Sequence, residues 1–390
     1  MDELGEVVKS SNPNLKMINP NSVIISLIYC LALAACGTSK TEEEKEISFY
    51  VGTYTLGESE GIYRYQLKSD GSLSNSGLVA KTENPSFLIR SADGKYLLAA
   101  NENSDENGGG GSVSSFAIDG EKLAFIDEIF SGGDSPCFLS EDQTGYVLVA
   151  NYGSGNVGLL KLESTGLLNG PLDVLQHEGK GTHQRQQGPH AHSACFTGSD
   201  NEVITVDLGT NELWFSRLDR DSNKLVLMSP AKLTMAPGSG PRHLAFHPTQ
   251  QWIYVINELT STITQLSKNS SGQYEIAATQ STLPTDYEGE NLCADIHISS
   301  DGQFLYASNR GHNSIVVFQI DSHDGSLSLV GHEDVHGDWP RNFTLSPDGH
   351  FLLVANQRSN NIVSFKRSQE TGTLEFVGEI DAPSPVCLLF

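Results

Sequence analysis

Short runs of apolar residues, separated by turns rich in Gly, Asp, Asn and Ser, follow one another along most of this chain. One unit shows the pattern clearly, with runs over residues 342–345, 350–355, 362–365 and 374–377. Runs of this length between turn-forming residues are typical of short β-strands. The pattern therefore predicts four strands in each unit, and no amphipathic helix of useful length interrupts it.

The units share a marker, which in its regular form is a Pro followed 16 residues later by an Asn. Three units keep this step, namely Pro85–Asn101, Pro241–Asn257 and Pro340–Asn356. Three other units vary it, namely Pro136–Asn151, Pro189–Asp207 and Cys293–Asn309. Successive Asn or Asp markers lie 47 to 56 residues apart. Four short antiparallel strands repeated at this period predict a β-propeller.

The two ends of the repeat region complement each other. Residues 49–53 and 61–67 match the second and third strands of a unit that lacks its first strand. Residues 385–390 match a first strand with nothing after it. Joining the ends closes a ring and leaves no exposed sheet edge. We therefore expect an all-β fold over residues 47–390, a single domain with seven four-stranded antiparallel blades.

The charge of the chain narrows the range of partners. With 24 Lys and Arg against 48 Asp and Glu, the formal net charge is −24. Nucleic acids need a basic face, so a nucleic-acid partner is not expected. Because cations are scarce here, a local cluster of Arg and His is informative.

The first 36 residues do not follow the propeller pattern. Residues 23–35 form an apolar run that is too short for a comfortable membrane span, and it ends in L-A-A-C-G. This ending resembles the bacterial lipoprotein signal, so residues 1–36 are predicted to be a signal peptide with lipidation at Cys36. Residues 37–46 then form a flexible acidic tether. The protein would be anchored in the cell envelope, on the periplasmic face or the outer membrane. A chance Cys in an ordinary signal peptide, or a short buried segment, is the alternative.

Four further cysteines fall near the first strand of a unit, namely Cys137, Cys195, Cys293 and Cys387. We expect buried free thiols there, although disulfides are the alternative in an oxidising compartment. No C-x-x-C occurs, so neither a metal site nor a redox motif is expected.

Equivalent positions of the repeat carry different polar and charged residues in different units, which packing alone does not require. The residues after the leading position of each unit are Ser86, Cys137, His190, Arg242, Ala294 and Arg341. The residues after the markers are Glu102, Tyr152, Leu208, Glu258, Arg310 and Gln357. These positions start one strand and end its antiparallel neighbour, so both sets are expected at one face, near the central channel. A funnel with several Arg side chains suits a small anionic ligand.

A structural explanation competes with this one. Arg and Glu at blade junctions often form ion pairs that hold blades together, which applies to Arg341 and to the pair Arg242 and Glu258. The loop over residues 179–188 either overhangs the funnel or is merely solvated. The His residues between 177 and 247 lack zinc-site spacing, so no metal is predicted.

Several motifs resemble a known family. They are G-T-Y-T at 52–55, G-P-H-A-H at 188–192, G-P-R-H at 240–243, S-N-R-G-H at 308–312 and W-P-R-N-F at 339–343. In this order they resemble the seven-bladed lactonase family, which includes the propeller type of 6-phosphogluconolactonase and the fungal carboxy-muconate lactonizing enzyme. The resemblance spans essentially the whole mature chain.

The resemblance implies a cofactor-free site. Its catalytic residues would be Arg242, Glu258 and either His190 or His192. Counting residues forward from Pro189 favours His190, whereas counting back from Asp207 gives His192, so the choice stays open. Arg310 would bind the substrate anion, and the further substrate-binding residues would be His243, His312 and Arg341.

The function expected from the resemblance is hydrolysis of a sugar-acid lactone. Water deprotonated by Glu258 or a His would attack the carbonyl, Arg242 would stabilise the oxyanion, and the His would protonate the leaving oxygen. A non-catalytic propeller that binds a sugar acid or a protein partner, and a lactonizing cycloisomerase, are the alternatives. Because 6-phosphogluconolactone is made inside the cell, an unphosphorylated lactone also fits the predicted envelope location.

Overall fold

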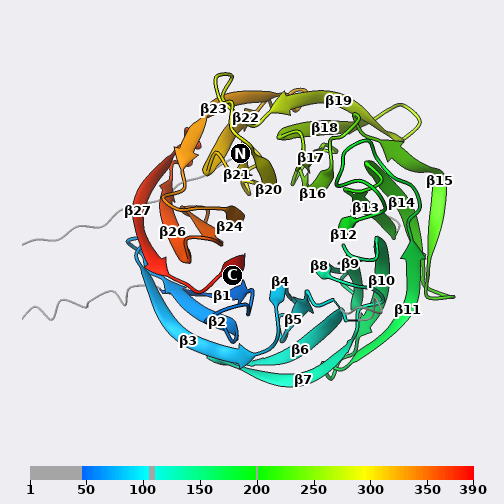
Figure 1. Ribbon diagram of the computed structural model, residues 1–390, viewed down its shortest axis with the longest axis horizontal. Coiled ribbons are helices and arrows are strands. Elements are labelled where there is room, and N and C mark those ends of the chain that lie inside the picture. Colours follow the sequence, from blue (N-terminus) through cyan, green and yellow to red (C-terminus); the bar gives the residue numbers. More distant parts are fainter. Residues whose placement is uncertain (1–45, 105–109, 199–200) are drawn as a thin grey trace, which may run out of the picture. The chain divides into compact units, whose positions relative to one another are not determined.

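The computed structural model describes residues 46–104, 110–198 and 201–390. These residues form seven four-stranded antiparallel sheets arranged around one axis (Figure 1). The predicted signal peptide, Cys36 and the tether up to residue 45 lie outside the described residues. Within the described ranges, no helix is long and apolar enough to cross a membrane.

Each blade is named here by its place in the ring, and its strands are given from the axis outwards. Blade 1 consists of β28 (Pro385–Leu389), β1 (Ile47–Thr53), β2 (Gly61–Leu67) and β3 (Leu73–Lys81). Blade 2 consists of β4 (Pro85–Arg90), β5 (Tyr96–Asn101), β6 (Ser112–Asp119) and β7 (Lys122–Phe130). Blade 3 consists of β8 (Pro136–Glu141), β9 (Tyr146–Asn151), β10 (Asn156–Leu162) and β11 (Leu168–Gln176).

The remaining blades follow the same order. Blade 4 consists of β12 (Ala191–Phe196), β13 (Glu202–Asp207), β14 (Glu212–Asp219) and β15 (Lys224–Thr234). Blade 5 consists of β16 (Pro241–Phe246), β17 (Ile253–Asn257), β18 (Thr262–Lys268) and β19 (Tyr274–Ser281). Blade 6 consists of β20 (Leu292–Ile298), β21 (Phe304–Arg310), β22 (Ser314–Ile320) and β23 (Leu327–Asp334). Blade 7 consists of β24 (Pro340–Leu345), β25 (Phe351–Asn356), β26 (Asn361–Arg367) and β27 (Leu374–Asp381).

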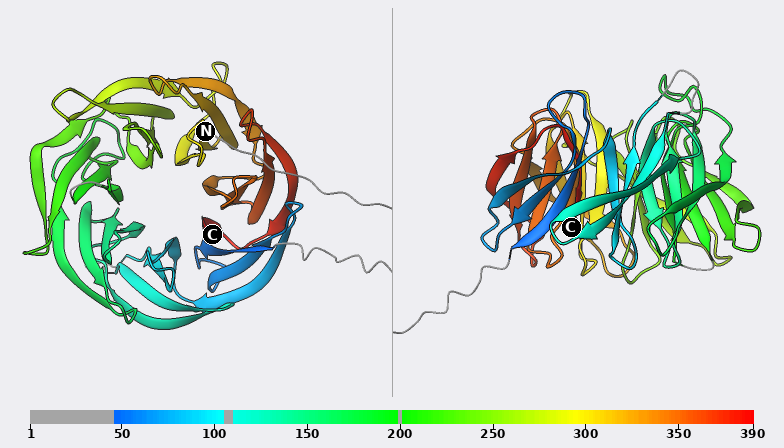
Figure 2. Two further views of the ribbon diagram at one scale, coloured as in Figure 1. Left: turned by 180° about the vertical axis from the view of Figure 1, so that it is seen from behind. Right: turned by 90° about the horizontal axis from the view of Figure 1, so that it is seen from below.

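The ring closes as the sequence predicts. β28 from the C-terminus pairs antiparallel with β1 from the N-terminal side, with Val51 opposite Leu388, and the two strands lie side by side in Figure 2. Phe49 and Leu388 belong to one apolar cluster that also contains Leu353 of blade 7. The closing strand therefore joins the ends of the chain through both hydrogen bonds and apolar packing.

The core lies between neighbouring blades. The second strands, such as β9 and β25, are buried along their whole length because a neighbouring blade covers each face. The cluster of Phe304 and Tyr306 from blade 6 with Phe343 and Phe365 from blade 7 is an example. In the described part of the chain, the fourth strands are the most exposed ones, and β19 is exposed along nearly its whole length.

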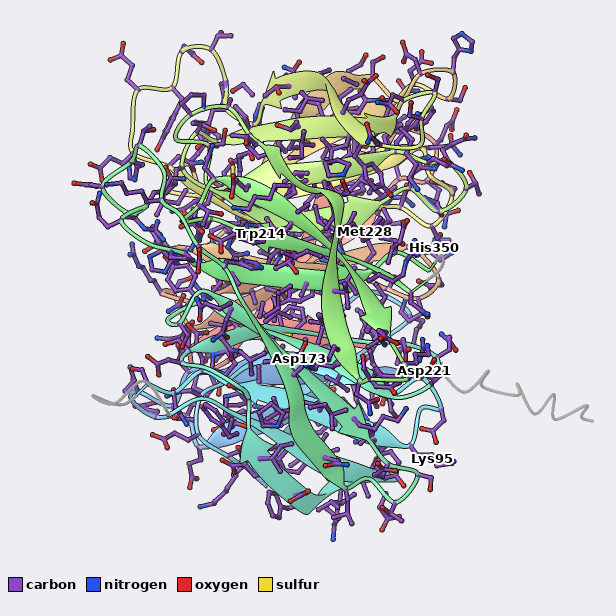
Figure 3. The ribbon with its side chains drawn as sticks, turned by 90° about the vertical axis from the view of Figure 1, so that its right-hand side faces the viewer. Lys95, Asp173, Trp214, Asp221, Met228 and His350 are labelled. Atoms are coloured by element: carbon purple, nitrogen blue, oxygen red, sulfur yellow. The ribbon has the colours of Figure 1, made fainter. Side chains whose placement is uncertain are left out.

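Polar contacts tie the outer strands together as well. Asp173 of β11 accepts a hydrogen bond from the backbone N–H of Leu225 in β15, with an oxygen–nitrogen distance of 2.8 Å. Figure 3 views this outer wall from the side and labels Asp173 together with Trp214 and Met228 of blade 4. The blades are thus linked at the rim by hydrogen bonds and, between their faces, by apolar clusters.

The four described cysteines are free thiols, as predicted. All of them lie on the first strands of their blades. Burial raises the pKa of Cys293 to about 11 and those of Cys195 and Cys387 to about 12. These thiols are therefore protonated and unreactive at neutral pH.

One irregularity recurs in every blade. The first strand contains one extra residue relative to the second strand, directly after the leading Pro or its equivalent. A β-bulge of this kind bends the strand and re-aims a side chain. The bulge residues, from blade 1 to blade 7, are Val386, Ser86, Cys137, His192, Arg242, Ala294 and Arg341.

In blade 4, His192 and not His190 occupies the bulge position. Asp207 pairs with Ala191 rather than with Pro189, because Pro189 and His190 precede β12. His192 therefore takes the position that Arg242 and Arg341 hold in their own blades. The sequence comparison of equivalent positions placed His190 there, and that alignment was wrong by two residues.

Candidate functional site

The bulge residues converge on the axis of the propeller. Ser86, Cys137, Arg242, Arg341 and Val386 border one small internal space, although they come from five different blades. His192 is next to them, with its Nδ1 3.7 Å from the Sγ of Cys137. The bulges thus bring side chains that are far apart in the sequence to one place.

Glu258 lies at the centre of the charged groups. It follows the last residue of β17, and its side chain is only 3% exposed. Its Oε2 lies 2.8 Å from Nη2 of Arg310 and 3.1 Å from Nε of Arg242, while its Oε1 lies 2.5 Å from Nη1 of Arg185. One buried carboxylate is therefore surrounded by three guanidinium groups.

These cations set the protonation state of Glu258. Burial alone would raise the pKa of Glu258, but Arg310, Arg242 and Arg185 outweigh it and lower the pKa to about 2. Burial also lowers the pKa of Arg310 to about 10 and lowers that of Arg242, which for a cation disfavours the charged form. Glu258 is therefore a carboxylate at neutral pH, and the site carries a net positive charge.

His192 is a buried, neutral imidazole. Its ring packs edge-on against the rings of Tyr152 and His243, at centroid distances of 5.5 and 5.3 Å. Burial, followed by the positive charge of Arg242, lowers the pKa of His192 well below its ordinary value. Its ring can therefore accept a proton or donate one N–H, but it does not carry a charge of its own.

His190 has a different environment. Its ring stacks on Tyr152 with a centroid distance of 4.5 Å, and its Nδ1 lies 2.9 Å from the carbonyl oxygen of Tyr152. Its backbone N–H donates to Asp207. These contacts make His190 part of the wall between blades 3 and 4, whereas His192 reaches the bulge position.

Arg341 lies across the funnel in blade 7. Its Nη2 is 3.7 Å from Oε2 of Glu102, which also accepts a 2.8 Å hydrogen bond from the hydroxyl of Tyr54. The guanidinium of Arg341 lies 5.2 Å from the centre of the Tyr54 ring. The site thus has a second carboxylate and Arg pair, and Tyr54 was not among the predicted site residues.

His243 lies behind Arg242. Its Nδ1 is 2.9 Å from Oδ1 of Asp295, and its ring nitrogens are 3.2 and 3.4 Å from Nη1 of Arg242. Asp295 is buried and also contacts His297 at 3.0 Å and Asn342 at 2.6 Å. Burial, followed by the charge of Arg242, lowers the pKa of His243 to about 4. These contacts suit a His243 that positions Arg242 better than the predicted His243 that binds substrate.

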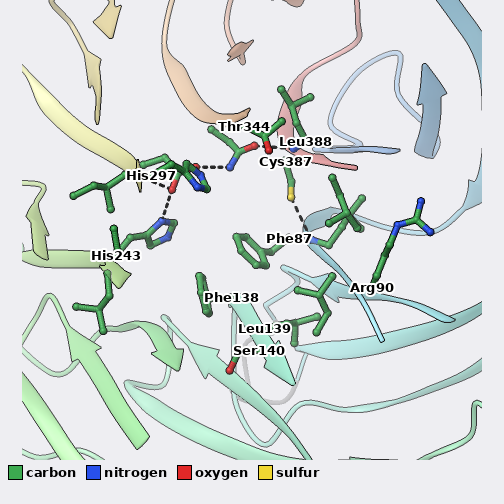
Figure 4. A pocket seen from close by; sticks show the side chains of 18 of the residues that line it. Phe87, Arg90, Phe138, Leu139, Ser140, His243, His297, Thr344, Cys387 and Leu388 are labelled. Carbon is green, nitrogen blue, oxygen red and sulfur yellow. Dashed lines mark hydrogen bonds and ion pairs between the residues drawn. The ribbon is translucent and has the colours of Figure 1, made fainter. Parts of the chain in front are cut away.

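The channel widens beyond this layer. A cavity of about 720 Å³ is lined by residues farther along six first strands, including Phe87, Phe138, Leu139 and Leu388. Figure 4 shows Phe87 and Phe138 beside the His243 ring, and a dashed line marks an interaction of His243. The walls of this cavity are largely apolar, so it differs in chemistry from the surroundings of Glu258.

His312 is not brought to Glu258. Its Nδ1 lies 2.7 Å from the hydroxyl of Ser314, and its ring packs edge-on against Tyr287 and against His332 of the outer strand β23. It therefore packs within blade 6. Arg310, only two residues earlier, points to Glu258 and donates from its Nη2 to the carbonyl of Cys293.

The loop over residues 177–190 contributes a residue that the sequence analysis missed. Arg185 contacts Glu258 and also donates a 3.1 Å hydrogen bond to the hydroxyl of Tyr152. The loop is fastened by Gln186, which is fully buried and donates to the carbonyl of Leu208. Of the two alternatives left open for this loop, the contact of Arg185 with Glu258 favours the one in which the loop overhangs the funnel. The scarcity of cations in this acidic chain was the one signal that pointed to it.

Within the described ranges, no group of three or more His, Cys, Asp or Glu side chains has the geometry to hold a metal ion. The polar groups around Glu258 are instead donors to anions.

The family profile described as "Lactonase, 7-bladed beta-propeller" matches residues 48–390. This chain belongs to the seven-bladed β-propeller lactonase family. A Bacillus subtilis protein named 6-phosphogluconolactonase is 38% identical to it over 299 residues, which cover 75% of this chain and 83% of that protein.

Solved structures agree with this assignment. A Pseudomonas aeruginosa structure described as a periplasmic gluconolactonase superposes with a TM-score of 0.84 at 32% identity, covering 88% of this chain and 98% of that one. A Bacteroides fragilis structure described as a putative 6-phosphogluconolactonase gives a TM-score of 0.81 at 33% identity, covering 88% and 97%. The fold and the family predicted from the motifs are both confirmed.

Proposed function

We propose that this protein hydrolyses a sugar-acid lactone at the site around Glu258. The observation that carries the proposal is the buried carboxylate held by three guanidinium groups, with the neutral His192 ring nearby. Membership of the lactonase family and the names of the relatives support hydrolysis over a binding-only role or ring closure.

The reaction needs a base, an oxyanion donor and a donor for the leaving oxygen. Glu258 takes a proton from water as the water oxygen bonds to the lactone carbonyl carbon. Arg242 stabilises the oxyanion that forms, and its Nε, which lies 3.1 Å from Oε2 of Glu258, holds it beside the attacking water. When the ring C–O bond breaks, the proton passes from Glu258 to the ring oxygen, directly or through His192. The product is an open-chain hydroxy acid.

The anion-binding groups are assigned to substrate recognition. Arg310 and Arg341 face the funnel from blades 6 and 7, and guanidinium groups bind carboxylate or phosphate through two parallel hydrogen bonds. No cofactor is part of the proposed reaction. A small anionic lactone is the proposed substrate.

We also propose that the protein acts outside the cytoplasm, anchored through a lipid on Cys36. The L-A-A-C-G sequence supports this, and the periplasmic description of the Pseudomonas structure supports the location. Labelling of cells with a radioactive fatty acid tests the anchor. Label in the wild type that is absent from Cys36→Ser supports the proposal, and equal label in both rejects it.

The test of the proposed activity is acid release from glucono-δ-lactone and from 6-phosphogluconolactone, measured above the spontaneous rate. The wild type is compared with Glu258→Gln and with Glu370→Gln, which changes an exposed carboxylate on an outer turn. Activity that is lost only in Glu258→Gln supports the proposal. A folded wild type without activity on either lactone contradicts it.

A further inference from the structure

The three cations around Glu258 differ in how easily a ligand can reach them. The side chain of Arg185 is 37% exposed, whereas those of Arg242 and Arg310 are 3% and 4% exposed. Arg242 and Arg310 both contact Oε2, and Arg185 contacts Oε1. Arg185 is therefore the cation that a ligand entering from solvent meets first, and it covers Oε1 of Glu258.

The backbone around Arg185 is held in place. Gln186 Nε2 donates to Leu208 at 2.7 Å and to Asn211 at 3.1 Å, and its Oε1 accepts from the backbone of His183 at 3.0 Å. The loop is closed on itself by a backbone hydrogen bond from Gly181 to Gln186. Because these contacts do not involve the Arg185 guanidinium, the side chain can leave Glu258 while the loop stays in position.

A second anchor keeps Arg185 at the site when it leaves Glu258. Its Nη2 donates to the hydroxyl of Tyr152, whose ring is fixed by stacking on His190. A guanidinium has five N–H donors, so Arg185 can hold this contact and still bind an anion. The anion would then lie in the funnel beside Tyr152.

The present arrangement is poor for proton transfer. With its pKa near 2, Glu258 is a weak base for the attacking water. The charged and titratable groups that face it are Arg185 from the loop, Arg242 from β16, Arg310 from β21, Arg341 from β24, Tyr152 beyond β9, Cys137 from β8 and Cys293 from β20. Of the three guanidiniums paired with the carboxylate, only that of Arg185 can move away without leaving a buried cation unpaired.

We propose that Arg185 is a specificity-determining residue that an anionic substituent of the lactone draws away from Glu258. A phosphate or second carboxylate on the substrate takes the guanidinium, and Oε1 becomes free to accept the proton of the attacking water. The inference rests on the proposed lactonase function. It predicts that lactones with an anionic substituent are hydrolysed in preference to neutral ones.

The test compares 6-phosphogluconolactone with glucono-δ-lactone in the purified full chain. Arg185→Gln is expected to lower kcat/KM for the phosphorylated lactone by roughly 10- to 100-fold, because a charge-assisted contact is lost. The same variant should hydrolyse glucono-δ-lactone at least as fast as the wild type. Lys180→Gln removes an exposed cation from the same loop and should change neither rate. Arg185→Lys should recover part of the preference.

Two further readouts separate this role from a structural one. Removing a cation raises the pKa of Glu258, so the acid limb of the kcat/KM profile for glucono-δ-lactone should move to higher pH in Arg185→Gln. Inorganic phosphate should accelerate glucono-δ-lactone hydrolysis in the wild type and not in Arg185→Gln.

Several results would overturn the proposal. One is an equal loss on both lactones with an unmoved acid limb. Another is a phosphate effect that is absent from the wild type, and a third is the same change in Lys180→Gln. A wild type that hydrolyses neither lactone rejects the proposed function itself. Activity with no change of preference in Arg185→Gln rejects only the role of Arg185.

Discussion

Replacing Glu258 by Gln removes the charge of a carboxylate that is almost completely buried among cations. The pKa of Glu258 falls from its ordinary value of 4.5 to about 2 in the folded protein. This difference of about 2.5 pH units corresponds to about 3 kcal/mol of folding free energy at neutral pH. Because Gln resembles the protonated acid, Glu258→Gln is expected to lose most of that amount at pH 7.

The sign of the pH dependence follows from the lowered pKa. The stabilisation by Glu258 is fully present above pH 4.5 and is lost as the pH falls through about 2. At pH 3, roughly half of the stabilisation remains on the same arithmetic. The gap in stability between wild type and Glu258→Gln should therefore narrow by about half between pH 7 and pH 3.

Urea unfolding of the two proteins at pH 7 and pH 3 measures this gap. Glu370→Gln is the matched control, because it makes the same chemical change at an exposed turn. A gap that is the same at both pH values would refute the ion-pair account and point to altered packing instead. If the wild type and Glu258→Gln have nearly the same free energy of unfolding at pH 7, the charge of the carboxylate does not stabilise the three Arg residues.

Three further predictions concern other parts of the protein. His192→Phe is expected to lower kcat by roughly 100-fold, and His190→Phe should lower it much less. If steady-state kinetics show the larger loss of kcat in His190→Phe, the catalytic role belongs to His190. Deleting residues 385–390 removes β28 and opens the ring, so calorimetry should show a Tm lower by at least about 5 °C, and an unchanged Tm would contradict the closing role of that strand. Asp295→Asn replaces a buried carboxylate that contacts His243 and Asn342, and should lower the free energy of unfolding in urea by about 3 kcal/mol. An unchanged urea midpoint would show that the charge of this carboxylate adds nothing to stability.

Much of the fold was predictable because its signals are local. Each strand is a short apolar run, and each turn is built from residues such as Ser346 to Gly349. The marker spacing works because the leading residue pairs with the marker across two strands, as Pro241 pairs with Asn257. Ring closure followed from an N-terminal unit that lacks its first strand and a C-terminal first strand with nothing after it, and β28 completes the blade beside β1.

The site was predictable only where the repeat imposes a position. Arg242, Glu258 and Arg310 stand next to leading or marker residues, and they meet as expected. His243 was grouped with its neighbour Arg242, and its ring lies against the Arg242 guanidinium and Asp295. His312 was grouped with Arg310 in the same way, although it belongs to a turn that faces the outer strand of its blade.

The sequence by itself determined the number of blades, their strand order and the three central charged residues, because these depend on spacing and local pattern. The tertiary structure decided which His enters the centre, because the bulge that re-aims His192 depends on pairing between strands. It also decided the contact of Arg185 with Glu258, since Arg185 lies in an irregular loop and reaches Glu258 across 73 residues of sequence. A loop side chain has no periodic position, so only folded coordinates show what it contacts.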